Sequence, residues 1–242
     1  MPAALVILLD TPRPPSPVHL RGWLYHTLTP RFPELHKGAG PRPFALAAGA
    51  GNDGGTWARF AFLDDALADA AAGALWDRLG KPLPLGKTQV RLLAVLEHAH
   101  PLAGKKSWPA LLGAEPASDV LLEFLTPTLF KKGDVHYPVP DPERILRSLI
   151  RRWNAFAPER MAEGLILELS KKVTARFLNV HTRAAHGHTR TPGFVGRIAL
   201  HFPKASEPEG RWVARLGELA FFSGVGAKTT LGFGLARRLE NA

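Results

Sequence analysis

The stretch SGVGAKTTLGFG, residues 223–234, lies between a helix-like segment and a strand-like segment. Its four glycines follow the spacing G-x-G-x5-G-x-G, and a Lys-Thr-Thr run lies between the two pairs. Glycine lets one backbone approach another closely, while lysine and threonine side chains donate hydrogen bonds to phosphate groups. The stretch therefore predicts a loop built for contact with a polyanion, with these candidate residues: Gly224, Gly226, Lys228, Thr229, Thr230, Gly232 and Gly234.

Two other interpretations of this glycine-rich stretch compete with the first. A nucleotide-binding P-loop requires glycine directly before the lysine and a helix after it, whereas here Ala227 precedes Lys228 and a strand follows. The P-loop interpretation therefore fails on both counts. A purely structural turn stays open, because a helix C-cap accounts for one glycine and a β-bulge for another.

The composition also favours a polyanionic partner. Among 242 residues, 31 Lys and Arg stand against 21 Asp and Glu, which gives a formal charge of +10. Phosphate contacts are electrostatic, so a chain this basic is suited to nucleic acid. The absence of cysteine excludes a disulfide framework and a cysteine-ligated zinc site. The apolar run at residues 3–9 is too short to span a membrane and lacks signal-peptide flanks, so we expect a cytoplasmic protein without membrane contact.

The first hundred residues carry six segments with the periodicity of regular structure. Leu20, Leu24 and Leu28 recur at i+4 spacing after Ser16-Pro17, a pair that suits the start of a helix. Short apolar runs bounded by glycine and proline indicate strands. The predicted order is strand, helix, strand, strand, helix, strand, over residues 3–9, 17–29, 43–48, 56–62, 64–79 and 87–98.

The same order recurs after residues 101–118, whose prolines, glycines and weak periodicity indicate a linker. One member of this second set is a long strand at 164–178, predicted because leucines at 165, 167 and 169 alternate along it. We therefore predict an α+β fold of two tandem ferredoxin-like (βαββαβ) domains, residues 1–100 and 119–242. The second set of elements covers residues 120–125, 142–156, 164–178, 194–202, 209–221 and 233–239.

Three blocks of the sequence resemble the CRISPR repeat-processing endoribonucleases, members of the repeat-associated RNA-binding superfamily. The blocks span nearly the whole chain in the family's order. They are PELH at 33–36 with PFAL at 43–46; FLTPTLF at 124–130 with prolines 138, 140 and 142 and LIRRWN at 149–154; and the glycine-rich stretch with Phe221 and Phe233.

The resemblance implies a reaction and a catalytic residue. In this family a histidine at the place of His36, in the loop after the first helix, is the usual catalytic residue. The implied reaction is metal-independent RNA cleavage, in which a 2′-hydroxyl attacks its own phosphodiester and leaves a 2′,3′-cyclic phosphate, or 3′-phosphate, and a 5′-hydroxyl. Imidazole supplies a proton acceptor or donor near neutral pH. RNA would lie across a cleft between the two domains, and no cofactor is required.

A cation beside the reacting phosphate is the second catalytic requirement. The family often places a polar or basic partner on the first helix, which makes Arg21 the candidate; an exposed helical arginine is the equally weighted alternative. Arg42 and Lys37 are nearby cations that could substitute, and Arg42 is also a candidate RNA contact.

Basic residues of the second half are further RNA-binding candidates. Between two predicted strands, a histidine- and arginine-rich segment suits a hairpin laid against an RNA duplex. Its histidines also have spacings that zinc accepts, but no carboxylate or cysteine accompanies them, so we predict no metal site. On the helix at 142–156, arginines recur opposite the apolar stripe, which is usually only a solvated face. The candidates are Arg176, His181, Arg183, His188 and Arg190 in the hairpin, and Arg147 and Arg151 on the helix.

The sequence thus predicts an endoribonuclease that cleaves precursor CRISPR RNA within the repeat. Its partners would be the precursor and the processed guide RNA, with a second copy of the chain and a CRISPR effector complex as additional candidates. Two other functions stay open. One is a non-catalytic guide-RNA-binding subunit, which has no use for His36, and the other is a nucleotide- or metal-dependent enzyme.

Overall fold

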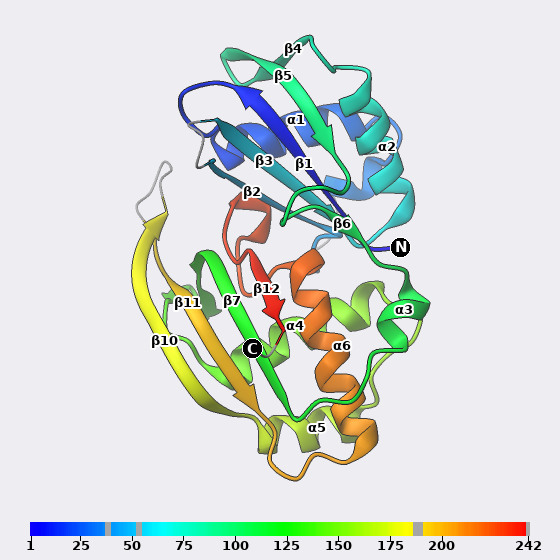
Figure 1. Ribbon diagram of the computed structural model, residues 1–242, viewed down its shortest axis with the longest axis vertical. Helices are drawn as coiled ribbons and strands as arrows, with labels where there is room; N and C mark the ends of the chain where they lie inside the picture. The colour runs from blue at the N-terminus through cyan, green and yellow to red at the C-terminus, as the bar shows by residue number, and fades with distance from the viewer. Residues whose placement is uncertain (37–39, 52–54, 186–190, 241–242) are drawn as a thin grey trace. The chain divides into compact units, whose positions relative to one another are not determined.

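The computed structural model describes residues 1–36, 40–51, 55–185 and 191–240. The chain divides into two compact units (Figure 1). The first consists of residues 1–106 with 230–232, and the second of residues 107–229 with 233–242.

The first unit contains one antiparallel sheet in the order β2-β3-β1-β5-β4, and β6 extends it beside β1. If β5 is taken as the fourth strand of the βαββαβ unit, the order 2-3-1-4 is that of the ferredoxin-like fold, so the predicted class is confirmed here. The elements are β1 (Ala3–Asp10), α1 (Pro17–Leu28), η1 (Pro33–His36), β2 (Phe44–Ala50), β3 (Thr56–Phe62), α2 (Asp65–Trp76), β4 (Pro82–Leu85), β5 (Thr88–Leu96) and β6 (Gly104–Lys105).

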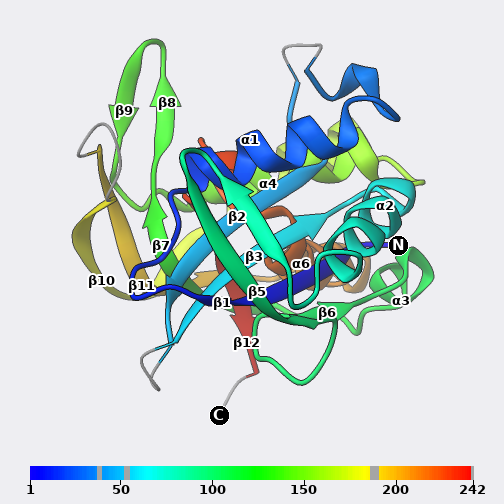
Figure 2. The same cartoon turned by 90° about the horizontal axis from the view of Figure 1, so that it is seen from above.

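The helices α1 and α2 cover one face of this sheet and enclose the core of the unit (Figure 2). The i+4 leucines of α1 are fully buried, as the spacing predicts, and they belong to the same hydrophobic core as Phe60 and Phe62 of β3. Trp23 adds an edge-to-face contact with Phe60, with the ring centroids 5.5 Å apart. Burial of this apolar face fixes α1, and with it the chain that leads into η1.

The second unit repeats the ferredoxin-like order, with the sheet β10-β11-β7-β12 and the helices α4 and α6 packed together. A separate hairpin, β8–β9, follows the first strand of the unit. The elements are α3 (Trp108–Leu112), β7 (Asp119–Thr128), β8 (Phe130–Lys132), β9 (Val135–Tyr137), α4 (Pro142–Phe156), α5 (Glu163–Lys172), β10 (Thr174–Ala185), β11 (Thr191–His201), α6 (Glu207–Ser223), η2 (Thr229–Leu231) and β12 (Ala236–Leu239).

The long strand predicted at 164–178 is wrong, because the structure has the helix α5 followed by the start of β10. Leucine alternation suggested a period of two, yet burial does not follow it: Leu169 is fully buried, whereas Leu167 is 56% exposed. Glu163 in the first turn and Lys171 and Lys172 in the last turn suit the helix dipole, and leucine, glutamate and lysine are good helix formers.

The stretch 101–118, expected as a linker, contains two short elements. The strand β6 pairs with β1, and the helix α3 packs against α6. Arg215 of α6 holds the end of α3, because its Nε and Nη2 donate to the carbonyl oxygen of Leu112 at 2.9 and 2.6 Å. The boundary between the two units falls between Lys106 and Ser107.

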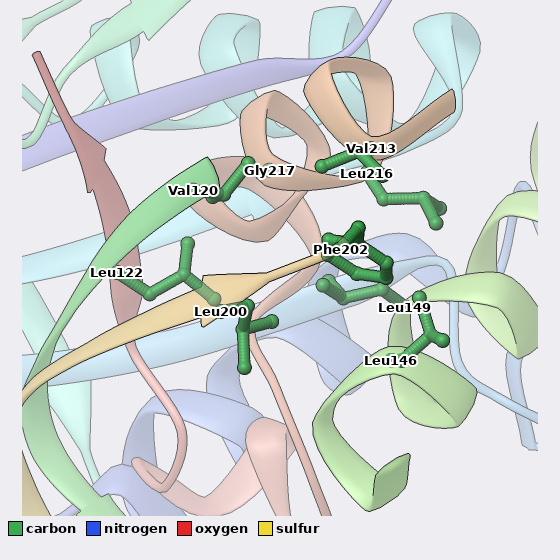
Figure 3. A pocket seen from close by; sticks show the side chains of 9 residues that line it. All are labelled: Val120, Leu122, Leu146, Leu149, Leu200, Phe202, Val213, Leu216 and Gly217. Atoms are coloured by element: carbon green, nitrogen blue, oxygen red, sulfur yellow. The ribbon is translucent and has the colours of Figure 1, made fainter. Parts of the chain in front are cut away.

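A small apolar void lies between the sheet and the helices of the second unit (Figure 3). Its volume is about 10 Å³, and its walls include Leu122, Leu146, Phe202 and Leu216. A space of this size and character holds no ligand and belongs to the core. Of the helices that the structure describes, none combines the length and the apolar character needed to cross a bilayer.

The helix α6 begins with a capping box that includes a strongly stabilised carboxylate. Ser206 donates its backbone N–H and its hydroxyl to Glu209, at 2.7 and 2.8 Å. Lys172 of α5 donates to the same side chain at 2.6 Å. The hydrogen bond from Lys172, followed by that from the Ser206 backbone, lowers the pKa of Glu209 from 4.5 to about 2. The carboxylate thus fastens α5 to the start of α6.

Replacement of this carboxylate should make the stability of the protein less dependent on pH in the acidic range. A group with a lowered folded-state pKa stabilises the fold above about pH 4.5 and loses that contribution as the pH falls toward 2. We expect Glu209→Gln to lower the Tm by about 2–4 °C at pH 7, and the difference from wild type to shrink between pH 4.5 and 2. Thermal unfolding followed by circular dichroism measures both.

The matched control is Glu207→Gln on the same helix, because Glu207 forms only an exposed i,i+4 pair with Arg211. Such pairs contribute little, so its Tm should stay close to that of wild type. Equal losses in the two variants would contradict the assigned role of Glu209.

Candidate RNA-binding and catalytic site

The glycines of the stretch 223–234, called the glycine loop below, are required by the protein's own backbone. Gly224, Gly226, Gly232 and Gly234 have φ values of +64°, +83°, +86° and +71°, in the region that side chains disfavour. A Cβ atom on Gly234 would clash with the carbonyl oxygen of Val225, and one on Gly226 with that of Leu129. The backbone conformation and close packing of the loop therefore account for its glycines, and RNA contact by the loop stays a prediction.

The end of β7 holds one side of the glycine loop. Ala227 and Gly234 donate their backbone N–H groups to the carbonyl oxygens of Leu129 and Pro127, at 2.8 and 3.0 Å. Leu235 donates to the hydroxyl of Thr126 at 2.9 Å. The block FLTPTLF at 124–130 is thus the strand on which the loop is built.

The helix α4 holds the other side of the glycine loop. Ser148 accepts the N–H of Gly226 at 2.8 Å, and Arg152 donates through Nη2 to the carbonyl oxygen of Gly226 at 3.0 Å. The same nitrogen lies 3.1 Å from the hydroxyl oxygen of Thr229. Arg152 is 7% exposed, and burial lowers its pKa from 12.5 to about 10.

Sequence reasoning singled out Arg147 and Arg151 on this helix and missed Arg152. The two predicted arginines are exposed, and Arg147 forms a surface ion pair with Glu143 at 2.6 Å. Arg152 lies three residues after Leu149, on the buried face of α4. A charged residue on an apolar stripe is the signal that could have identified it.

The polar side chains of the glycine loop differ in accessibility. Thr229 is buried at 4% exposure, and its hydroxyl is engaged by Arg152 within the protein. Lys228 and Thr230 are partly exposed. Lys228 has a φ of +60°, and its Nζ lies 5.8 Å from the centre of the Phe233 ring. These two side chains are therefore the ones in the loop's polar run that can still reach a ligand.

The predicted basic hairpin is described in part. Arg176, His181 and Arg183 lie on β10, an exposed edge strand of the second sheet. Arg176 is 70% exposed and lies 3.7 Å from Asp119. Among the residues that the structure describes, no three His, Asp or Glu side chains cluster in a way that could hold a metal ion. The other two candidates of the predicted hairpin, His188 and Arg190, lie outside the described residues.

The predicted catalytic residue His36 ends the short helix η1. This turn is anchored by Leu35, which is buried in the core of the first unit, and by a hydrogen bond from Phe32 N–H to the carbonyl oxygen of Leu28. Arg42 donates from Nη1 to the carbonyl oxygen of Leu35 at 3.1 Å, next to His36. The side chain of His36 and the cation Lys37 lie outside the described residues. The backbone that carries His36 is thus fixed by the core.

Arg21 lies on α1, the helix against which η1 packs. Its side chain is partly exposed, and within the described residues it has no hydrogen-bond or ion-pair partner. Tyr25, one turn further along, packs edge-to-face on Phe44 of β2. The helix that carries Arg21 therefore contacts the turn that carries His36. Arg42 is hydrogen-bonded to the backbone of the same turn.

Comparison with known proteins gives matches to the CRISPR-associated endoribonuclease Cas6. A family model for the CRISPR-associated endoribonuclease Cas6 matches residues 122–236. Cas6 endoribonucleases of two Mycobacterium tuberculosis strains are 33% identical over 118 residues, which is 48% of this chain and 37% of theirs. The match thus spans little more than a third of the length of these curated relatives.

The solved structures match over nearly the whole chain. A product complex of a Thermus Cas6 is 42% identical, covers 99% of both chains and has a TM-score of 0.91. A variant of that Cas6 with a histidine replaced by alanine is 41% identical, with 99% coverage of both chains and a TM-score of 0.90. Identity at this level over both full lengths shows that the chain belongs to the Cas6 family of CRISPR-associated endoribonucleases.

Proposed function

We propose that this protein is an endoribonuclease that cleaves precursor CRISPR RNA within the repeat. The observation that carries the proposal is the 42% identity, over 99% of both chains, with a Cas6 that was solved as a product complex. The glycine loop supports it, because Lys228 lies between Ala227 and Thr229, which hydrogen bonds from the chain after β7 and from α4 hold in place. The formal charge of +10 supports it as well, since RNA is a polyanion.

The proposed reaction needs only groups that the chain and the RNA supply. The 2′-hydroxyl oxygen attacks the adjacent phosphorus as its proton is taken up, and the bond to the 5′-oxygen breaks. The departing 5′-oxygen gains a proton, which leaves a 2′,3′-cyclic phosphate and a 5′-hydroxyl. The imidazole of His36 is the proposed proton-transfer group, because its ordinary pKa lies near neutral pH. Arg21 is the proposed cation for the charge that builds on the phosphate oxygens.

Replacement of His36 should strongly slow cleavage while RNA binding persists. We expect His36→Ala to lower the single-turnover cleavage rate by about 10²–10⁴-fold, the usual contribution of a proton-transfer group. The measurement uses repeat RNA at saturating protein in excess chelator, with the cleaved ends identified by mass spectrometry. A substrate with a 2′-deoxy nucleotide at the cut site should bind and stay intact.

The control for this experiment is His26→Ala, because His26 is an exposed histidine on α1. Its cleavage rate should match that of wild type. Tight binding without cleavage by wild-type protein would favour a non-catalytic guide-RNA-binding subunit. Cleavage that chelator stops would favour a metal-dependent enzyme, and unchanged cleavage by His36→Ala would remove His36 as the catalyst.

Replacement of Arg21 should slow the chemical step more than it weakens binding. Loss of a group that stabilises charge in the transition state costs about 10²–10³-fold in rate. We expect Arg21→Ala to show this loss at saturating protein, and Arg21→Lys to recover part of it because the charge is restored. Single-turnover cleavage and filter binding measured on the same variants separate the two effects.

The matched control is Arg31→Ala, which removes an exposed cation from the segment after α1. Its single-turnover rate should stay within about threefold of wild type, since surface charges mainly affect the rate at which protein and RNA associate. Equal rate losses for Arg21→Ala and Arg31→Ala would mean that Arg21 acts only as one of several surface charges and does not stabilise the transition state.

A further inference from the structure

Arg152 is a buried cation that the proposed chemistry does not use. It projects from α4 beneath the glycine loop, where its two described acceptors are the carbonyl oxygen of Gly226 and the hydroxyl of Thr229. Within the described residues, no carboxylate forms an ion pair with it. Burying a guanidinium against neutral acceptors is costly, and a residue that serves only packing would be apolar. The hydrogen bonds to the loop therefore account for an arginine at this place.

The two polar groups of the Gly226 backbone are both held from α4. Ser148 accepts the N–H, and Arg152, one helical turn later, donates to the carbonyl oxygen. Arg152 also donates to the hydroxyl of Thr229, which lies within the polar run Lys228-Thr229-Thr230. With its pKa lowered to about 10, Arg152 stays protonated at neutral pH and keeps both bonds. One buried side chain thus binds the loop on both sides of Lys228, at Gly226 and Thr229, before any ligand arrives.

We propose that Arg152 is a positioning residue that holds the glycine loop in the shape in which it binds repeat RNA. This role rests on the proposed function. Lys228 supplies a contact, and Arg152 lowers the entropy cost of ordering the backbone that carries it, so that the loss of Arg152 weakens binding without removal of a phosphate contact.

The test uses Arg152→Met and Arg152→Lys in the full chain. Methionine fills similar space and makes neither hydrogen bond, whereas lysine keeps the charge and one donor group. The dissociation constant for uncleaved 2′-deoxy repeat RNA should rise at least about tenfold in Arg152→Met and less in Arg152→Lys. The single-turnover rate at saturating protein should change less than about threefold, because the bound complex still presents the phosphate to the catalytic residues.

Arg215→Met is the matched control. Arg215 is also a partly buried arginine of the second unit that donates twice to backbone, and its acceptor, the carbonyl oxygen of Leu112, belongs to α3 and not to the glycine loop. Its loss should lower the Tm by an amount comparable to that in Arg152→Met and leave the RNA affinity within about twofold of wild type. Equal losses of affinity in both variants would reduce the effect of Arg152 to general destabilisation and overturn the proposal.

Salt dependence separates positioning from direct contact. A side chain that neutralises one phosphate contributes about one unit to the slope of log affinity against log salt. Lys228→Ala should reduce this slope by about one, whereas Arg152→Met should leave it unchanged. A reduced slope in Arg152→Met would assign Arg152 to phosphate contact and overturn the positioning role.

Hydrogen exchange gives a measurement that needs no RNA. Amides of residues 226–229 should exchange faster in Arg152→Met than in wild type or Arg215→Met, because this part of the loop has lost its anchor. Unchanged exchange together with unchanged affinity would overturn the proposal while the proposed function stands. A wild-type chain without affinity for repeat RNA would overturn the proposed function and this role with it.

Discussion

At Gly226 three segments that are far apart in the sequence meet: the glycine loop, the chain at the end of β7 and the helix α4. The residue lies against the end of β7, and α4 binds both of its backbone polar groups. Buried backbone groups must be paired, so this one glycine sets how closely the loop, the strand and the helix approach. The remaining glycines of the loop satisfy the same constraint, since the backbone of Val225 leaves no room for a side chain at Gly234.

The sequence blocks that resemble the Cas6 family in the second unit are physical partners. FLTPTLF supplies the strand end, LIRRWN supplies the helix with Arg152, and the glycine loop lies against both. Their joint occurrence in one chain therefore reflects a single packing arrangement. In the first unit, PELH forms the turn η1 and PFAL begins β2, with Arg42 between them donating to the turn. A family signature here corresponds to the contacts that hold the site in shape.

The sequence predicted the ferredoxin-like order in both units, because the apolar face of α1 and the short apolar strands carry clear periodicity. The prediction failed at α5, where alternating leucines indicated a strand but the segment forms a helix. A short apolar segment fits either structure, and packing against the rest of the unit determines which leucines are buried. The prediction also missed Arg152 and Ser148, since the need for both arises only when the loop folds back across α4. Thr229 was grouped with ligand-facing residues, although its hydroxyl is used within the protein. Tertiary contacts of this kind leave little trace in local patterns.

The residues that shape the glycine loop are 74 to 109 positions away from their partners along the chain. Contacts with so large a sequence separation form late, because the entropy of closing the intervening chain must be overcome first. The strand β12 follows directly after the loop and pairs with β7, so it completes the sheet on whose strand end the loop is built. A molecule whose second sheet is incomplete therefore lacks the strand end on which the loop is built. The RNA-binding shape proposed for the loop thus depends on completion of that sheet.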